Sequence, residues 1–147
     1  MNKRAYLIGS LRNPNVPVVA NYLRSEHGLN IFDDWYAAGP EADDKWMAYE
    51  KGRGRDFSSA LAGAAAQHVF AFDRENIGAS QAAVLVLPAG KSGHLELGWA
   101  AGMGKLTAIL LEGEPERYDV MYNFADLITN DLSALGKWLS LHIGDHE

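Results

Sequence analysis

Residues 89–96, Ala-Gly-Lys-Ser-Gly-His-Leu-Glu, bring several reactive side chains together directly after an apolar run at residues 82–87. Gly-Lys-Ser at 90–92 imitates the end of a phosphate-binding P-loop, but the first glycine of that motif would fall on Leu85, inside the apolar run. His94-Leu95-Glu96 imitates the His-x-Glu of zinc nucleobase deaminases, which also need cysteine ligands, and the chain has no cysteine. Both interpretations are excluded, and the carboxylate of Glu96 remains as the candidate reactive group.

The pattern around Glu96 predicts the first turn of a helix that Ser92 caps and that runs to about Met103. The helix dipole and the free backbone N–H groups favour an ionised carboxylate there, and an ionised carboxylate is the nucleophile that attacks a sugar carbon in retaining glycosidases. Glycines at 90, 93 and 98 would let the backbone approach a ligand closely. On position alone, a glutamate that merely stabilises the helix is the commoner case.

The stretch Ser-Gly-His-Leu-Glu-Leu-Gly-Trp-Ala at 92–100, followed by Gly104-Lys105, resembles the Gly-x-x-x-Glu-Leu-Gly-x-Ala…Gly-Lys signature of the nucleoside 2-deoxyribosyltransferase family. That family includes the 2′-deoxynucleoside 5′-phosphate N-hydrolases and the pyrimidine nucleotide N-glycosidases. By position, the family glutamate that forms a covalent glycosyl intermediate at C1′ is Glu96. The resemblance implies cleavage or transfer at the N-glycosidic bond of a (deoxy)nucleoside or its 5′-monophosphate, with no cofactor.

Two further segments are similar to catalytic parts of the family. Tyr-Leu-Ile-Gly at 6–9 is similar to the family's first strand, from which Tyr6 points either into the core or into the pocket. Asp73 falls near the family's active-site aspartate, which orients the glutamate and assists the leaving base. The alternative for Asp73 is an ordinary carboxylate on a helix surface. The resemblance therefore makes Glu96, Asp73 and Tyr6 the catalytic candidates.

The substrate-binding candidates lie in three loops that follow predicted strands, where ligands bind in open α/β sheets. The loop Gly-Ser-Leu-Arg is similar to one that helps hold a 5′-phosphate in the nucleotide hydrolases; otherwise its arginine is a solvated surface charge. Asp34 and Trp35 suit the edge and face of a base, unless the tryptophan only buries its loop. His94 is placed either for acid–base work or towards solvent. The full set is Gly9, Ser10, Arg12, Asp34, Trp35, Ser92, Gly93 and His94.

The elements that must position these side chains alternate between strands and helices. Short apolar strands are predicted at residues 5–9, 29–32, 82–87 and 107–111, with a weak strand near 127–128. Helices are predicted at about 17–28, 92–103 and 131–142, and a long one after Asp56 interrupted near Phe70; residues 33–55 are predicted as a loop with one helical turn at 46–49. This order predicts a flavodoxin-like or Rossmann-like parallel sheet with helices on both faces, a single domain over residues 1–147.

The composition of the chain limits the classes of partner that we expect it to bind. With 13 basic and 19 acidic residues the net charge is −6, and no basic stripe suits duplex nucleic acid. No apolar run approaches the length of a membrane span, no cysteine is present, and no cluster has metal-ligand spacing, so we expect a cytoplasmic protein without a metal. The resemblance implies a homodimer or larger homo-oligomer whose pocket a neighbouring subunit completes, and residues 118–123 are where we expect that contact.

Two other functions stay open. A TIR-like enzyme that cleaves NAD also uses a glutamate at an N-glycosidic bond. A non-catalytic nucleotide sensor would keep the pocket without the chemistry, and Gln81 supports it by standing near the place where the family often has a second acidic residue.

Overall fold

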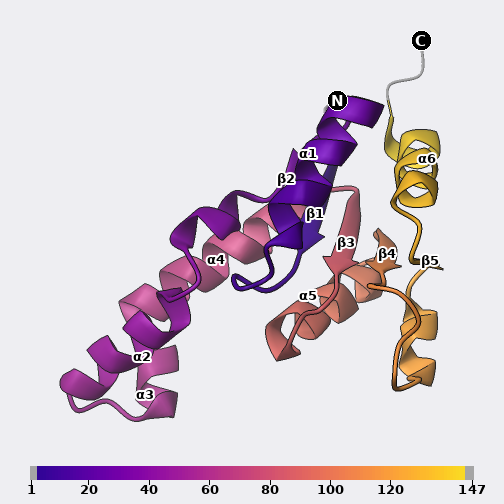
Figure 1. The fold of residues 1–147 in the computed structure, drawn as a ribbon. Helices are drawn as coiled ribbons and strands as arrows, with labels where there is room; N and C mark the ends of the chain where they lie inside the picture. The colour runs from indigo at the N-terminus through magenta and orange to yellow at the C-terminus, as the bar shows by residue number, and fades with distance from the viewer. Residues whose placement is uncertain (1–2, 145–147) are drawn as a thin grey trace.

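Five short, mainly apolar strands form one parallel sheet in the computed structural model, which describes residues 3–144 (Figure 1). The strand order is β2-β1-β3-β4-β5, the flavodoxin-like order, so the predicted fold class is confirmed. All five residues of β3 are buried, as expected for a central parallel strand. The strands are β1 (Arg4–Ile8), β2 (Asn30–Phe32), β3 (Ala82–Val86), β4 (Leu106–Leu110) and β5 (Leu127–Thr129).

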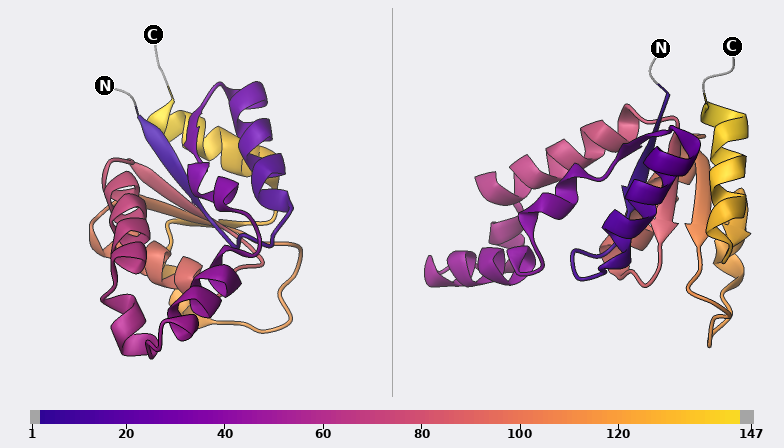
Figure 2. Two further views of the ribbon diagram at one scale, coloured as in Figure 1. Left: turned by 90° about the vertical axis from the view of Figure 1, so that its left-hand side faces the viewer. Right: turned by 45° about the horizontal axis from the view of Figure 1, so that its top comes forward.

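Each face of the sheet carries its own pair of helices (Figures 1 and 2). Helices α1 (Asn15–His27) and α6 (Leu132–Ile143) build one core with Ala5 and Leu7 of β1. Helices α4 (Ala64–Gly78) and α5 (Lys91–Gly102) build the other core with Tyr6 and Ile8. Because side chains alternate along a strand, Tyr6 faces the same side as α4 and α5.

The order of the strands reverses between β1 and β3, which pair in parallel from Ala5↔Ala82 to Ile8↔Leu85. From β1 the chain crosses to β2 on one side, and from β3 it continues to β4 on the other. The loops that leave the carboxyl ends of β1 and β3 therefore diverge and leave a crevice between them. Both loops contain residues that the sequence marked as candidates.

The segment between β2 and β3 differs from the expectation, because residues 33–55 are mainly helical. They contain a 3-10 helix, η1 (Asp34–Ala38), and α2 (Ala42–Gly52), and the chain continues through α3 (Phe57–Leu61) into α4. These helices extend beyond the sheet as an arm (Figure 2). The break in the long predicted helix lies at residues 62–63, not near Phe70, because Asp56 caps α3 and the extended Gly63 starts α4 anew. The polar, glycine-containing composition masked this helical segment.

Helix α5 begins earlier than predicted. Gly90 is its N-cap residue, without a side-chain cap, and the amide of His94 donates to the Gly90 carbonyl at 3.3 Å. Ser92 is therefore the second helical residue and not the cap. Glu96 consequently lies in the second turn, two residues further from the helix N-terminus than the sequence indicated.

The C-terminal elements agree with the prediction. Strand β5 pairs with β4, and Asp131 caps α6 by accepting from the amides of Ser133 and Ala134. The single predicted domain spans 1–147; residues 1–2 and 145–147 lie outside the described residues, and the rest belongs to one sheet with its helices. Within residues 3–144, no helix combines the length and apolar character needed to cross a membrane.

Replacing Leu139 by Ala tests the core beneath α6. Leu139 is completely buried, so the variant should lose about 2–5 kcal/mol of unfolding free energy from lost burial and the cavity left behind. Leu141→Ala, on the same helix at 68% exposure, should change it by less than about 0.5 kcal/mol. Urea unfolding measures both, and equal losses would contradict the assignment of the buried face.

Candidate active site

Three elements bring Tyr6, Asp73 and Glu96 together on one face of the sheet. Tyr6 is the third residue of β1, Asp73 lies on α4 and Glu96 on α5. The Tyr6 hydroxyl lies within hydrogen-bonding reach of both carboxylates. The sequence predicted these three residues as one group, and the fold collects them from positions 6, 73 and 96.

The surroundings of this group are apolar. Tyr6 is 1% exposed and stacks on Phe32 with 5.3 Å between ring centroids, and Phe32 in turn contacts Phe72 at 5.9 Å. The Oε2 atom of Glu96 is buried without a hydrogen-bond partner. A buried acceptor without a partner is costly and uncommon in a folded protein. The described residues therefore leave one hydrogen-bonding position of Glu96 unfilled.

Burial, together with the charge of Asp73, raises the pKa of Glu96 to about 7, although the hydrogen bond from Tyr6 lowers it. Burial also raises the pKa of Asp73. The pKa of Tyr6 is raised by its burial and by both carboxylates, so the phenol stays protonated. The expectation of a Glu96 ionised by the helix dipole is therefore wrong, because the side chain sits in the second turn, in an apolar setting, beside a like charge.

One hydroxyl proton cannot satisfy two carboxylates at once, since a phenol has a single donor. When Tyr6 donates to one carboxylate, the other can bond to the phenol oxygen only if it carries a proton itself. The group is therefore best satisfied with one proton shared between Asp73 and Glu96, and the raised pKa values of both residues agree with this. One acid and one base in contact are what acid–base and nucleophilic chemistry require.

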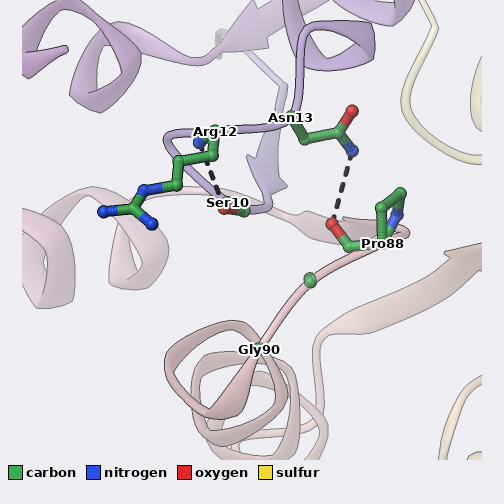
Figure 3. Close-up of a pocket in the computed structure, with 6 residues that line it drawn as sticks. Ser10, Arg12, Asn13, Pro88 and Gly90 are labelled. Carbon is green, nitrogen blue, oxygen red and sulfur yellow. Dashed lines mark hydrogen bonds between the residues drawn. The ribbon is translucent and has the colours of Figure 1, made fainter. Parts of the chain in front are cut away.

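A cavity of about 260 Å³ lies at the switch point between β1 and β3 (Figure 3). It is lined by Ser10, Arg12, Asn13, Pro88, Ala89 and Gly90. Two of the predicted binding residues, Ser10 and Arg12, are therefore at a cavity, and the N-terminus of α5 opens onto it through Gly90. Unpaired N–H groups of a first helical turn are a favourable environment for an anion.

The Arg12 guanidinium is held outside this cavity. Its Nη2 donates to Asp44 Oδ2 at 2.7 Å and its Nε donates to the Pro40 carbonyl at 3.3 Å. The Arg12 amide donates to the Ser10 hydroxyl at 3.1 Å, which fixes the loop. Figure 3 shows the side chain extending away from Pro88 and Gly90.

Asn13 is a lining residue that the sequence reading did not select. It is 4% exposed, its Nδ2 donates to the Pro88 carbonyl at 3.4 Å, and its Oδ1 accepts from the amide of Asn15 at 2.9 Å. Asn13 thus ties the loop after β1 to the loop after β3. A buried amide in a polar loop was the available signal, but its partner is 75 residues away.

Two candidate glycines serve close packing. A Cβ at Gly9 would lie 2.9 Å from Val16, and one at Gly93 would lie 3.0 Å from Leu85 and 3.2 Å from Ile8. Gly93 therefore lets α5 approach the sheet closely, which sets the depth at which Glu96 is held. Neither glycine lines the cavity.

Trp35 and Asp34 lie on η1, away from the cavity lining. The Trp35 indole N–H donates to the Leu7 carbonyl at 2.7 Å, and the ring packs against both cores. The indole N–H is therefore used within the fold and is not free to bond to a ligand base. Asp34 is exposed.

His94 and Ser92 are exposed on the first turn of α5. His94 bonds through Nδ1 to the Gly90 carbonyl at 2.8 Å and through Nε2 to the Tyr122 hydroxyl at 2.9 Å. The Nε2 bond attaches the 3-10 helix η2 (Val120–Phe124) to α5, and the Nδ1 bond holds the ring against the start of its own helix. Ser92 does not line the cavity.

The end of the sequence signature lies at the amino ends of the strands, opposite the end at which the cavity lies. Lys105 directly precedes β4, and its Nζ donates to the carbonyls of Gly78 and Ser80 at 2.9 and 2.7 Å. It therefore fastens the C-terminus of α4 to the sheet. Among residues 3–144 no group of His, Asp and Glu is arranged to hold a metal ion.

Neither a family model nor a curated protein matches the sequence. The structure is similar to that of Clostridium botulinum CMP N-glycosidase, BcmB, with a TM-score of 0.51 and 18% sequence identity, over 94% of this chain and 99% of that one. At this identity the likeness establishes a common fold. The resemblance to nucleotide N-glycosidases that the sequence indicated is thus matched by a structural neighbour of that kind.

Proposed function

We propose that this protein cleaves the N-glycosidic bond of a nucleoside 5′-monophosphate, through a covalent intermediate on Glu96. The observation that carries the proposal is the pair of carboxyl groups on one phenol, in an apolar setting where burial raises the pKa of both Asp73 and Glu96. The buried, unpartnered Oε2 of Glu96 is the atom that would approach C1′. The fold shared with a CMP N-glycosidase supports the same reaction class.

In the first step, the bond between C1′ and the base nitrogen breaks, and its electron pair leaves with the base. Asp73 supplies the proton that the base takes up, and a Glu96 oxygen forms an ester bond to C1′. In the second step, water attacks C1′ and releases Glu96 while Asp73 accepts the water proton. Tyr6 stays protonated throughout and donates to whichever carboxylate carries the charge.

The cavity at the switch point would hold the 5′-phosphate. Glu96 is six residues beyond Gly90, about 9 Å along the helix axis, and helix side chains lean back towards the N-terminus. That separation suits a ribose spanning from the phosphate at the start of α5 to C1′ at Glu96. The Ser10 hydroxyl, the α5 amides and Arg12 are the donors for the phosphate oxygens.

We also propose a homo-oligomer that covers the apolar surface of α4 and α5. Val69, Phe70 and Phe72 on α4 are 58%, 57% and 43% exposed, and Leu95 and Trp99 on α5 are 75% and 40% exposed. The apolar face predicted for the long helix is thus largely solvent-exposed in one copy. Large exposed apolar side chains gathered on two helices of one face are typical of an interaction site.

Release of free base should be lost in Glu96→Gln, because the amide is not a nucleophile. The assay offers nucleosides, nucleoside 5′-monophosphates and NAD, with and without an acceptor base, and separates free base by chromatography. We expect base release from a monophosphate without acceptor; exchange only with acceptor indicates a transferase, nicotinamide an NAD glycohydrolase, and binding without turnover a sensor. Undiminished release by the variant would contradict the role of Glu96.

The same variant has a built-in test of folding. Because the pKa of Glu96 is higher in the folded state than its usual 4.5, ionised Glu96 costs stability, and this cost grows as the pH rises from 4.5 towards 7. Glu96→Gln should therefore be more resistant to urea than the wild type at about pH 8, with a smaller difference at about pH 5. Lost activity with raised stability separates a chemical role from misfolding.

The pH dependence of base release should shift in opposite directions in two variants. The wild-type kcat/KM should rise as the pH passes about 7, because Glu96 must ionise to attack. Asp73→Asn removes the like charge and moves this limb to lower pH, whereas Tyr6→Phe removes the hydrogen bond and moves it to higher pH. Carboxyl ¹³C NMR follows the same titration without turnover. Shifts in one common direction would contradict the shared-proton group.

Sedimentation of the wild type and two variants should detect the oligomer and show which face of the subunit it buries. The wild type should sediment as a dimer or larger, and Val69→Asp should dissociate it by placing a charge in the interface. Val18→Asp is the matched control, because Val18 is 59% exposed on α1, on the other face of the sheet. A monomeric wild type, or equal effects of the two variants, would remove the proposal.

A further inference from the structure

The cavity at the switch point has a single charged side chain among its described lining residues, Arg12. Its guanidinium nevertheless points out of the cavity (Figure 3) and contacts the arm formed by residues 34–63. An anion in this cavity can use Arg12 only if the side chain turns inwards. That rotation requires breaking the bonds to Asp44 and to the Pro40 carbonyl.

The ion pair between Arg12 and Asp44 is short but exposed to solvent. The ion pair measures 2.7 Å, but the side chains of Arg12 and Asp44 are 65% and 62% exposed. An exposed ion pair is screened by water and contributes little to stability, so a competing anion can displace it. A phosphate monoester carries up to two negative charges and accepts a guanidinium in a bidentate manner, which makes it an effective competitor.

We propose that Asp44 is a specificity-determining residue that competes with a phosphate monoester for Arg12. In the empty site Asp44 occupies the guanidinium, and binding of the phosphate displaces it. The competition lowers the affinity for phosphorylated ligands and leaves the affinity for an uncharged nucleoside unchanged. This inference rests on the proposed phosphate subsite and adds a residue from the arm to it.

The opposite role for Asp44 would be to orient Arg12 towards the phosphate. A carboxylate that orients an arginine must hold it with free N–H groups directed at the ligand. Here the side chain extends away from Pro88 and Gly90 (Figure 3), and its guanidinium bonds to Asp44 in the first turn of α2. The geometry therefore favours competition, and the two roles predict changes of opposite sign.

The test is a titration with inorganic phosphate, followed by NMR through the backbone amides at the start of α5. Asp44→Asn should bind phosphate about two- to fivefold more tightly than the wild type, since it removes an exposed ion pair. Asp43→Asn is the matched control: Asp43 is the other exposed acid in the first turn of α2, and its loss should leave the affinity close to the wild-type value. Arg12→Gln should weaken binding, alone and combined with Asp44→Asn.

The kinetic counterpart uses a nucleoside 5′-monophosphate and the matching nucleoside. Asp44→Asn should lower KM for the monophosphate and leave kcat and the values for the nucleoside unchanged. Unchanged or weaker phosphate binding in Asp44→Asn, or an equal gain in Asp43→Asn, would overturn the inference while leaving Glu96 chemistry intact. Absence of phosphate binding in wild type and variants would overturn both this inference and the phosphate subsite, but not cleavage of unphosphorylated nucleosides.

Discussion

The site depends on one phenol that two carboxylates share in an apolar setting. Tyr6 can donate one proton, Asp73 and Glu96 are both destabilised as anions, and the two helices that carry them are held against the same strand. The group can be fully hydrogen-bonded only with one further proton between the carboxyl groups. The folded chain therefore holds two carboxyl groups whose pKa values are both raised, which costs stability when they ionise; perturbed groups of this kind are common at functional sites.

The sheet topology explains why this group and the cavity draw on the same elements, although Tyr6, Asp73 and Glu96 are not among the residues that line the cavity. Strand β1 supplies Tyr6 on the face of α4 and α5, and then supplies the loop that lines the cavity. Strand β3 lies beside β1 and leads into α5, which starts at the cavity and carries Glu96 six residues beyond Gly90. Asn13 joins the two loops across the crevice by donating to the Pro88 carbonyl. Reversal of strand order at this point thus brings a helix N-terminus, which favours anions, to the cavity, on the same helix that carries Glu96.

Within the family-like signature, some residues pack the fold, and Glu96 is the candidate for chemistry. Gly93 permits the close approach of α5 to Ile8 and Leu85. Lys105 holds the C-terminus of α4 at the amino ends of the strands. Only Glu96 of that stretch presents a buried, unpartnered polar atom. A sequence signature of this kind therefore includes residues that pack the helix against the sheet as well as the candidate reactive residue.

Tyr6, Asp73 and Glu96 were chosen from a resemblance to a known family, and their catalytic roles stay a prediction. The local pattern of the sequence was sufficient for the strands and the parallel α/β class, because apolar periodicity is a local property. It was insufficient for the arm, since the helices at 42–52 and 57–61 are polar or short and carry no clear apolar stripe. The raised pKa of Glu96 could not be predicted from the local pattern either, because it depends on burial and on Asp73, which elements distant in the chain bring about. Likewise, the partners of Asn13 and Arg12 lie 75 and 32 residues away, and only tertiary contacts decide whether a loop side chain faces a cavity or an ion pair.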